Sequence, residues 1–235
     1  RSASVAPLAG DRALAEQVID GGLRTAQRLV PTIDEVVRAA DRSLSDVGLL
    51  AVAVGPGSFT GLRIGVMTAK TLAYALDLPV IGVGTLACIT HRAPPDVSRL
   101  GAVFPAERGQ VYAANFHRGA AGAWVPRDAA GTDSVEVESV HLIDASDWLA
   151  ELESDAASVA SPLYVSGPPL ATLRDRLPPT VRCLDESLWQ PTARAVAELA
   201  LRDYQAGRRD DVWRLTPLYV RRSAAEENRD ASPPI

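Results

Sequence analysis

The pattern of apolar and polar positions predicts a central strand that runs into a turn and a helix. Leu49 to Val54 is an uninterrupted apolar run, typical of a strand covered on both faces, and Gly55-Pro56-Gly57 ends it. A helix follows to about Leu76, with Ser58 or Thr60 as its cap. The other predicted elements lie on either side of this unit.

The residues before this strand predict a hairpin and a helix. Two short apolar segments, Ser4 to Leu8 and Ala13 to Ile19, flank a Gly10-Asp11-Arg12 turn. Leu23 to Ala40 carries apolar residues at the three- and four-residue spacing of a helix. Pro31 lies inside this helix, so we expect it to kink the helix or to mark a second start.

After the central helix, strands and helices continue to alternate. Arg92 to Ser98, which contains two prolines, is the best domain boundary, and the order of elements begins again beyond it. Further strands are expected at Val80 to Val83, Gly101 to Phe104, Gln110 to Phe116, Val135 to Ile143, Leu163 to Val165 and Val181 to Leu184. Further helices are expected at Thr85 to His91, at Asp147 to Leu152 (with a linker then running to Ser161), from the turn Ser166-Gly167-Pro168-Pro169 to Leu177, and at Pro191 to Ala206.

This order of elements predicts a duplicated α/β fold of two lobes. The N-terminal lobe would comprise residues 1–93 and the C-terminal lobe residues 101–222. Residues 223–235 are polar and end in prolines, so we expect a mobile tail. The chain has no initiator Met and starts within an apparent strand, so some N-terminal sequence is expected to be missing.

Composition narrows the class of protein. With 235 residues and 47% hydrophobic content, the chain can bury real cores. A net charge of −5 argues against an autonomous RNA-binding protein. The two cysteines, Cys88 and Cys183, form no metal-binding or redox motif, and no apolar run approaches ~20 residues. We therefore expect a soluble cytoplasmic protein without a membrane contact.

The glycine-rich turn is the first candidate for chemistry. A strand, turn and helix start expose backbone N–H groups that suit an anion, although a purely structural turn is the favoured alternative. The spacing from Gly55 to Gly61 is one residue too long for a P-loop, and Leu62-Arg63 replaces the required Lys-Ser/Thr. The candidate nucleotide-binding residues are Gly55, Gly57, Ser58, Gly61 and, in a similar turn of the second half, Gly167.

No catalytic or metal-binding set is evident. His91, His117 and His141 are scattered, and none has a second ligand at helical spacing. Cys88 lies in an apolar stretch and is interpreted as a core thiol. We therefore predict no catalytic residues and no metal site.

The central helix carries two adjacent stripes that could meet another element. One contains Leu62, Val66, Ala69, Ala73 and Leu76, and the other contains Gly61, Gly65, Thr68 and Leu72. Small residues let another backbone come close, which favours packing of the helix on a sheet within the fold. The alternative is helix packing across a subunit contact.

The motif around the turn resembles the TsaB (YeaZ) family. The resemblance rests on Gly55-Pro-Gly-Ser-Phe-Thr-Gly-Leu-Arg-Ile-Gly65, Thr68-Ala-Lys70 and Gly82-Val-Gly-Thr-Leu86. Weaker similarity continues in Arg108-Gly-Gln-Val-Tyr112 and in Leu215-Thr-Pro-Leu-Tyr-Val-Arg221. The matching segments span most of the chain.

The resemblance implies a two-lobed actin-like or sugar-kinase-like (ASKHA) fold. It also implies a non-catalytic platform subunit of the bacterial proteins that make threonylcarbamoyladenosine in tRNA. Such a subunit forms homodimers and binds the catalytic TsaD subunit, together with the TsaE ATPase, and meets tRNA only through the complex. No cofactor is implied, and ATP or ADP would lie only at the partner or the subunit interface.

We expect the partner contact on apolar helix faces. Its residues would be Leu29, Ile33, Val37, Gly61, Gly65, Val66, Ala69 and Ala73. The family's opening strand, which faces phosphate in the wider fold, is absent from this chain, and this departure weakens catalytic interpretations more than the scaffold interpretation. The alternative function is an actin-like ATPase or a glycopeptidase-like enzyme that acts alone.

Overall fold

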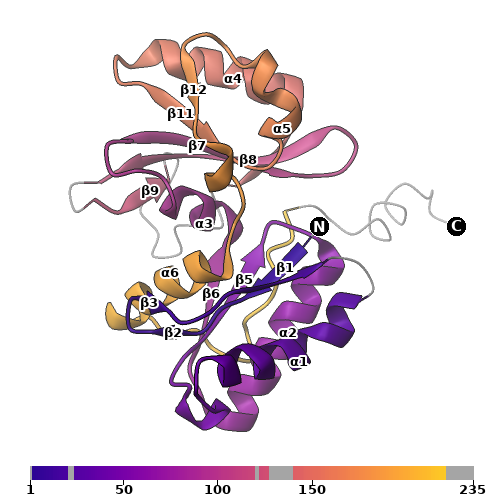
Figure 1. Ribbon diagram of the computed structural model, residues 1–235. Coiled ribbons are helices and arrows are strands. Elements are labelled where there is room, and N and C mark those ends of the chain that lie inside the picture. The colour runs from indigo at the N-terminus through magenta and orange to yellow at the C-terminus, as the bar shows by residue number, and fades with distance from the viewer. Residues whose placement is uncertain (1, 21–23, 120–121, 127–139, 221–235) are drawn as a thin grey trace, which may run out of the picture.

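The computed structural model describes residues 2–20, 24–119, 122–126 and 140–220 of the 235-residue chain. Strands and helices pack as a mixed α/β structure, which confirms the predicted class (Figure 1). The sheets fall into two groups, one formed before residue 85 and one formed after residue 98. Within the described residues, no helix combines the length and the apolar character that crossing a bilayer requires.

The first group of strands forms three small sheets. Its members are β1 (Ser2–Val5), β2 (Leu8–Ala9), β3 (Arg12–Ala13), β4 (Gln17–Asp20), β5 (Leu50–Gly55) and β6 (Val80–Gly84). β1 pairs antiparallel with β4 and β2 with β3, which confirms the predicted hairpin. β5 pairs in parallel with β6. Among the described residues, no strand joins the β1–β4 sheet to the β5–β6 sheet.

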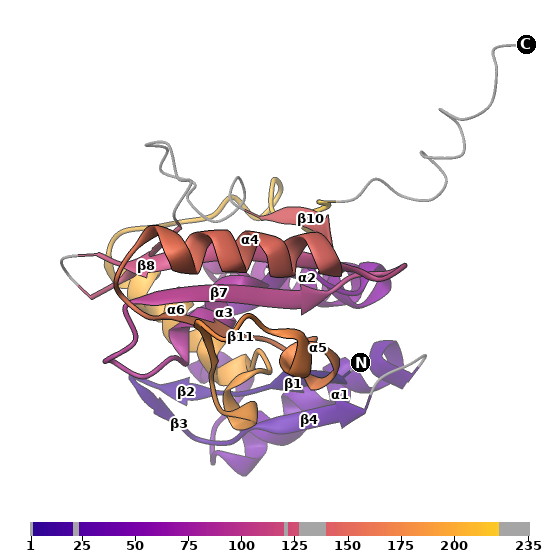
Figure 2. The same cartoon turned by 90° about the horizontal axis from the view of Figure 1, so that it is seen from above.

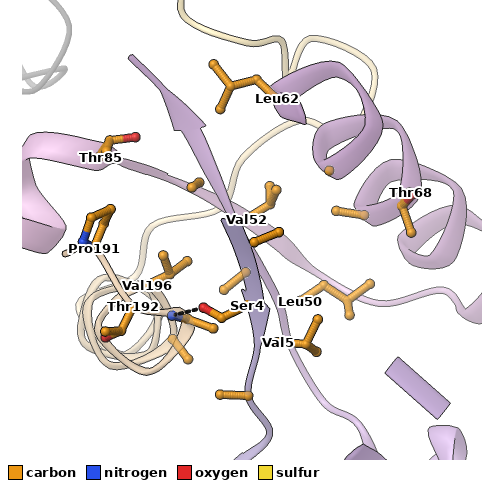
Figure 3. A pocket seen from close by; sticks show the side chains of 18 of the residues that line it. Ser4, Val5, Leu50, Val52, Leu62, Thr68, Thr85, Pro191, Thr192 and Val196 are labelled. Carbon is orange, nitrogen blue, oxygen red and sulfur yellow. Dashed lines mark hydrogen bonds between the residues drawn. The ribbon is translucent and has the colours of Figure 1, made fainter. Parts of the chain in front are cut away.

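Helices cover both faces of these strands. They are α1 (Arg24–Ala39), α2 (Phe59–Leu76), α3 (Thr85–His91) and, from the far end of the chain, α6 (Ala193–Gln205), with a 3₁₀ turn at Leu44–Asp46. α1 packs on β1 and β4, and α2 packs on β5. α6 covers β1, β5 and β6 from the opposite face (Figure 3). α1 continues through Pro31, so a second helix does not start there.

The second group is one mixed sheet. Its strands are β7 (Arg99–Pro105), β8 (Gln110–Arg118), β9 (Trp124–Pro126), β10 (His141–Asp144), β11 (Leu163–Ser166) and β12 (Val181–Cys183). Their order is β10-β8-β7-β11-β12, with β9 paired to β8. β7 and β8, both predicted as strands, pair antiparallel as a hairpin, and Arg108 and Gly109 at its tip both have positive φ, as a tight two-residue turn requires.

Two helices and two short 3₁₀ turns accompany this sheet. They are α4 (Ala145–Ser158), α5 (Leu170–Leu173), η2 (Arg174–Arg176) and η3 (Glu186–Leu188). α4 runs along the sheet beside β8 and β7 (Figure 2). The predicted linker before Ser161 is wrong, because α4 continues to Ser158. The strand predicted at Val135 to Ile143 lies mostly outside the described residues, as do residues 223–235.

Each of the two groups of strands has its own cluster of buried apolar side chains. In the second group, Trp148 and Leu152 of α4 pack against Val103 and Val165. In the first, Ile81 and Cys88 pack against α6 through residues such as Leu199, so the interpretation of Cys88 as a core thiol is confirmed. α6 therefore belongs by packing to the N-terminal strands, although it follows the second sheet in sequence.

Candidate functional site

The turn after β5 is shaped by contact with the C-terminal segment. Gly55 is buried with a φ of 125°, and a Cβ atom there would lie 3.1 Å from the carbonyl oxygen of Leu218. Leu218 also donates its N–H to the carbonyl of Val54 at 2.7 Å. The close approach of a second backbone and the positive φ together require glycine at position 55.

The start of α2 is capped by the chain itself. Ser58 Oγ accepts a hydrogen bond from the N–H of Gly61 at 3.4 Å, and the Ser58 carbonyl accepts from the N–H of Leu62 at 2.8 Å. Gly57, Ser58 and Gly61 line the large cavity described below. Two of the predicted nucleotide-binding residues therefore already make the cap of the helix.

The second glycine turn is also explained by packing. Gly167 has a φ of 145°, and a Cβ atom there would lie 1.8 Å from the carbonyl oxygen of Val103. Only glycine fits so close to the backbone of β7. Gly55 and Gly167 do not line the cavity that the other three candidates share.

A large cavity lies between the β1–β4 sheet and the β5–β6 sheet. Its volume is about 1510 Å³, and residues of both β1 and β5, among them Ser4 and Val52, line it (Figure 3). α1 and α2 contribute one wall, and α6 contributes the other. Ser4 on β1 accepts a hydrogen bond from the N–H of Ala193 at 2.9 Å, which fixes the start of α6 against this strand.

The predicted partner-binding residues face inward. Val37, Val66, Ala69 and Ala73 are buried in the monomer, with Val66 only 1% exposed. The half-buried members, Leu29, Ile33, Gly61 and Gly65, all line the cavity. A Cβ atom on Gly65 would lie 3.6 Å from Val52 Cγ2, so this glycine lets α2 approach β5 within the fold. The favoured interpretation of the small-residue stripe, a helix against a sheet, agrees with this contact.

Another face of α2 is exposed and rich in aromatic residues, and Phe59 at its start also lines the cavity. Phe59, Arg63, Met67 and Tyr74 follow one another at helical spacing, and Trp213 and Tyr219 of the C-terminal segment lie beside them. Met67, Tyr74 and Trp213 are 59%, 69% and 71% exposed. We call these six residues the aromatic face. The spacing on α2 was visible in the sequence, but the two C-terminal partners were not.

Contacts within the aromatic face hold its side chains in place. The ring centroids of Phe59 and Tyr219 are 5.3 Å apart, and those of Tyr74 and Trp213 are also 5.3 Å apart. The Arg63 guanidinium lies 3.8 Å from the Phe59 ring centroid and donates to Tyr219 Oη at 2.8 Å. Lys70 donates to the carbonyls of Trp213 and Leu215. The surface is therefore ordered before any partner binds.

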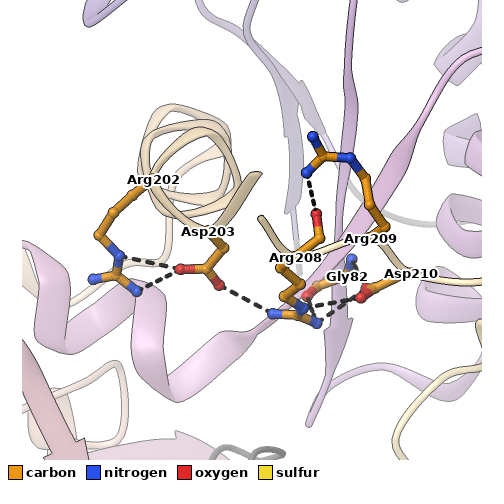
Figure 4. A network of polar contacts seen from close by, with 6 residues as sticks. All are labelled: Gly82, Arg202, Asp203, Arg208, Arg209 and Asp210. Carbon is orange, nitrogen blue, oxygen red and sulfur yellow. Dashed lines mark hydrogen bonds and ion pairs between the residues drawn. The ribbon is translucent and has the colours of Figure 1, made fainter. Parts of the chain in front are cut away.

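A polar network fastens the C-terminal segment to β6 (Figure 4). Arg208 donates to Asp203 on α6, to Asp210 and to the carbonyl of Gly82, and Asp210 accepts the N–H of Gly82 at 2.8 Å. A Cβ atom on Gly82 would lie 2.5 Å from Val54 Cγ1, so β6 needs glycine here. This network links α6, β6 and the segment that carries Trp213.

Two of the three histidines are engaged with carboxylates. His91 Nε2 lies 3.0 Å from Glu198 Oε2, and His141 Nε2 lies 3.3 Å from Glu151 Oε2. Burial raises the pKa of Glu198, but hydrogen bonds from Arg194 and His91 outweigh it and hold the pKa of this carboxyl below its ordinary value. In the described part of the chain, no three His, Cys, Asp or Glu residues are grouped as a metal site would need.

Comparison with protein families gives one extensive match. The family model described as "TsaD: tRNA N6-adenosine threonylcarbamoyltransferase" matches residues 24–228. Two curated relatives are named "tRNA threonylcarbamoyladenosine biosynthesis protein TsaB". The one from Escherichia coli K12 is 39% identical over 100 residues, which are 42% of this chain and 43% of the relative. The one from Bacillus subtilis 168 is 35% identical over 108 residues, which are 46% of this chain and 47% of the relative. The chain thus spans less than half the length of these relatives.

Solved structures match over nearly the whole chain. A Pseudomonas aeruginosa protein described as similar to peptidase YEAZ has a TM-score of 0.73 and 28% identity, over 94% of each chain. YeaZ from Pseudomonas aeruginosa has a TM-score of 0.72 and 26% identity, over 93% of this chain and 94% of its own. The resemblance to TsaB (YeaZ) found in the sequence is confirmed.

Proposed function

The chain belongs to the TsaD family of tRNA N6-adenosine threonylcarbamoyltransferase proteins, with TsaB (YeaZ) proteins as its relatives, and we propose that it is a non-catalytic platform subunit. It would serve the formation of threonylcarbamoyladenosine in tRNA, in the cytoplasm. It would form homodimers and bind a catalytic TsaD subunit, with TsaE as a further partner. tRNA would be reached only through this complex.

The aromatic face is the observation that carries the proposal. Exposed aromatic residues, Met and Arg are enriched at the centres of protein interfaces, where a few of them supply most of the binding energy. Here they form one patch on α2, and tilted and edge-to-face ring contacts with Tyr219 and Trp213 already restrict the rotamers of Phe59 and Tyr74. A preordered patch loses less side-chain entropy on binding. A contact that buries roughly 800 Å² on each partner would be ordinary for such a surface.

The same proposal assigns no nucleotide to this chain. The two glycines that most resemble a phosphate turn, Gly55 and Gly167, are explained by their contacts with Leu218 and Val103. Ser58 is used as the cap of α2. ATP or ADP would then lie at the partner or at the subunit interface. The proposal includes a duplicated actin-like fold, with lobes at residues 1–93 and 101–222.

The test replaces one residue at the centre of the aromatic face. Met67→Glu adds a charge on the exposed side of α2, where Met67 is 59% exposed, so the monomer should stay folded. Sedimentation should show loss of the dimer, and pull-down with a TsaD subunit should fail. Reconstituted tRNA modification from purified partners should fall by at least about tenfold, because an unpaired charge must be desolvated in the contact.

Val18→Glu is the matched control, because Val18 is 62% exposed on β4, away from α2. It should leave both associations and the modification reaction unchanged. The buried Ala69 is unsuitable for this test, since a charge there would disturb the packing of α2 on the sheet. Unchanged association of Met67→Glu with both partners would refute the proposed docking surface.

A further inference from the structure

Met67 is the only methionine among the 235 residues, and its side chain is open to solvent. Methionine is usually buried, but Met67 is 59% exposed. On α2, Arg63 precedes it by one turn and Tyr74 follows it by two turns, so the thioether lies in the middle of the aromatic face. The single thioether of the chain is therefore accessible at the centre of the proposed docking surface.

The two cysteines are less accessible to oxidants than Met67. Cysteine reacts with mild oxidants as the thiolate, and only where the sulfur can be reached. Cys88 is fully buried. Cys183 is half-buried, and burial raises the pKa of its thiol above the ordinary value, although the charge of Arg174 offsets part of this effect. At neutral pH the sulfur most open to an oxidant is therefore that of Met67.

We propose that Met67 is an oxidation-sensitive switch of the aromatic face: a peroxide converts its thioether to the sulfoxide and so weakens association, an inference that rests on the proposed function. The sulfur lone pair attacks one oxygen of hydrogen peroxide, the O–O bond breaks and an S–O bond forms. The sulfur gives up two electrons, and the other oxygen leaves as hydroxide. This hydroxide becomes water when it takes the proton of the transferred oxygen.

The sulfoxide makes the centre of the surface polar. Oxidation turns a flexible apolar side chain into a polar, chiral one, whose oxygen needs a hydrogen-bond donor once it is buried. Two donors on neighbouring turns are already engaged. The Arg63 guanidinium lies over the Phe59 ring and donates to Tyr219 Oη, and the Thr71 hydroxyl donates to the Met67 carbonyl at 2.8 Å. Burial of the sulfoxide in the contact would therefore leave its oxygen unpaired or break these interactions.

Assembly and oxidation should oppose each other. Peroxide reaches Met67 in the free chain, whereas a partner seated on the aromatic face would cover it. Hydrogen peroxide should therefore oxidise Met67 more slowly in the assembled complex with a TsaD subunit than in the free chain. Equal rates would show that the contact leaves Met67 open, and would overturn the switch.

The test treats the purified chain with hydrogen peroxide and then removes the excess with catalase. Peptide mapping by mass spectrometry should find one added oxygen on Met67 before any on Cys183 or Trp213. Sedimentation and pull-down with a TsaD subunit should then show association at least about tenfold weaker, and methionine sulfoxide reductases should restore it. Oxidation of another residue first, or a loss of association that the reductases do not reverse, would overturn the proposal.

Met67→Leu is the matched control, because it keeps an apolar side chain of similar size without the sulfur. It should associate like the wild type and remain unaffected by peroxide. If peroxide weakens its association as much as that of the wild type, another residue is responsible and the switch is overturned. If Met67→Leu itself does not associate, reversal of the wild-type loss by the reductases decides instead.

Met67→Glu distinguishes failure of the switch from failure of the docking surface. If Met67→Glu no longer associates while complete oxidation of Met67 leaves association unchanged, the switch is overturned and the docking surface stands. If neither change affects association, both are overturned.

Discussion

Some positions of this chain require glycine because another backbone segment packs closely against them. At Gly167 two constraints coincide, a φ of 145° and the Val103 carbonyl at 1.8 Å from any Cβ atom. At Gly109 only one applies, since its φ is 77° but nothing lies within 4 Å of a Cβ atom. Comparing substitutions at Gly167 and Gly109 therefore separates the free-energy cost of a steric clash from that of a positive φ.

We predict that Gly167→Ala lowers the free energy of unfolding by at least about 3 kcal/mol, because β7 and the turn must separate. Gly109→Ala should lower it by only about 1 kcal/mol, the cost of a positive φ alone. Urea unfolding followed by circular dichroism measures both values. Equal decreases in the free energy of unfolding would mean that the turn after β11 can move away from β7 at little cost. A nucleotide-binding role for Gly167 would then regain support.

The sequence identified these glycine turns but not what they do. A turn with a positive φ, a close neighbouring backbone and a phosphate-binding loop all require glycine, so the sequence alone does not distinguish them. The deciding contacts come from Leu218 and Val103, which are far from Gly55 and Gly167 in sequence. The resemblance to a family could be seen in the motif, whereas the role of each glycine required the tertiary contacts.

At the scale of elements, α6 is joined to α3 by a small ionic cluster. Glu198 accepts from Arg194 at 2.6 Å on its own helix and meets His91 of α3 at 3.0 Å. Hydrogen bonding to these groups outweighs burial and keeps the pKa of Glu198 below its ordinary value of 4.5. A carboxyl with a lowered pKa stabilises the fold above that ordinary value, and this stabilisation is lost as the pH falls through the folded pKa.

Glu198→Gln should therefore destabilise the protein at pH 7 by on the order of 1 kcal/mol. The difference from the wild type should shrink as the pH falls below 4.5, where the wild-type carboxyl takes up a proton. Urea unfolding at a series of pH values measures it. Glu153→Gln, at an exposed position of α4, is the control and should change the free energy of unfolding by less than about 0.5 kcal/mol. A difference that stays constant below pH 4.5 would contradict the ionic account.

Most elements could be predicted from periodicity, but their orientation could not. α2 was predicted with nearly correct ends, yet it has apolar or small residues on several stripes, so the sequence did not decide which stripe faces the sheet. Arg99 of β7, which pairs with Asp155 at 2.7 Å, helps to explain why α4 continues through an Asp/Ser/Ala-rich stretch that resembles a linker. Both outcomes depend on partners distant in sequence.

At the scale of the whole molecule, the chain crosses between its two groups of strands more than once. The first crossing was predictable, because Arg92 to Ser98 contains two prolines and separates two similar series of elements. The return of α6 to β5 and β6 was not, because its amphipathic pattern would suit either group. The C-terminal segment then supplies Trp213 and Tyr219 to the aromatic face, so this surface exists only in the folded chain.

Arg118 of β8 fastens the first crossing. Its guanidinium donates to the carbonyls of Ala93, Pro94 and Val97 at 3.0, 2.9 and 2.7 Å, and lies 4.4 Å from the Trp124 ring centroid. A single cation thus pairs several carbonyls of a segment that belongs to neither sheet. We therefore expect Arg118 to stabilise the connection between the two groups of strands.

Arg118→Met keeps the apolar stem but removes every donor, so the free energy of unfolding should fall by about 2–4 kcal/mol. Amide exchange at Val97, whose N–H bonds to the Pro94 carbonyl, should accelerate more than exchange within β11, because the crossing loosens first. Arg118→Lys should fall in between, since one ammonium cannot reach all of these carbonyls. Arg182→Met is the control, because the hydrogen bond that Arg182 donates within the described residues goes to the Tyr164 hydroxyl at an exposed site, and it should change stability by less than about 0.5 kcal/mol. If the two Met variants are equally stable, the crossing is held by its prolines and its packing instead of by Arg118.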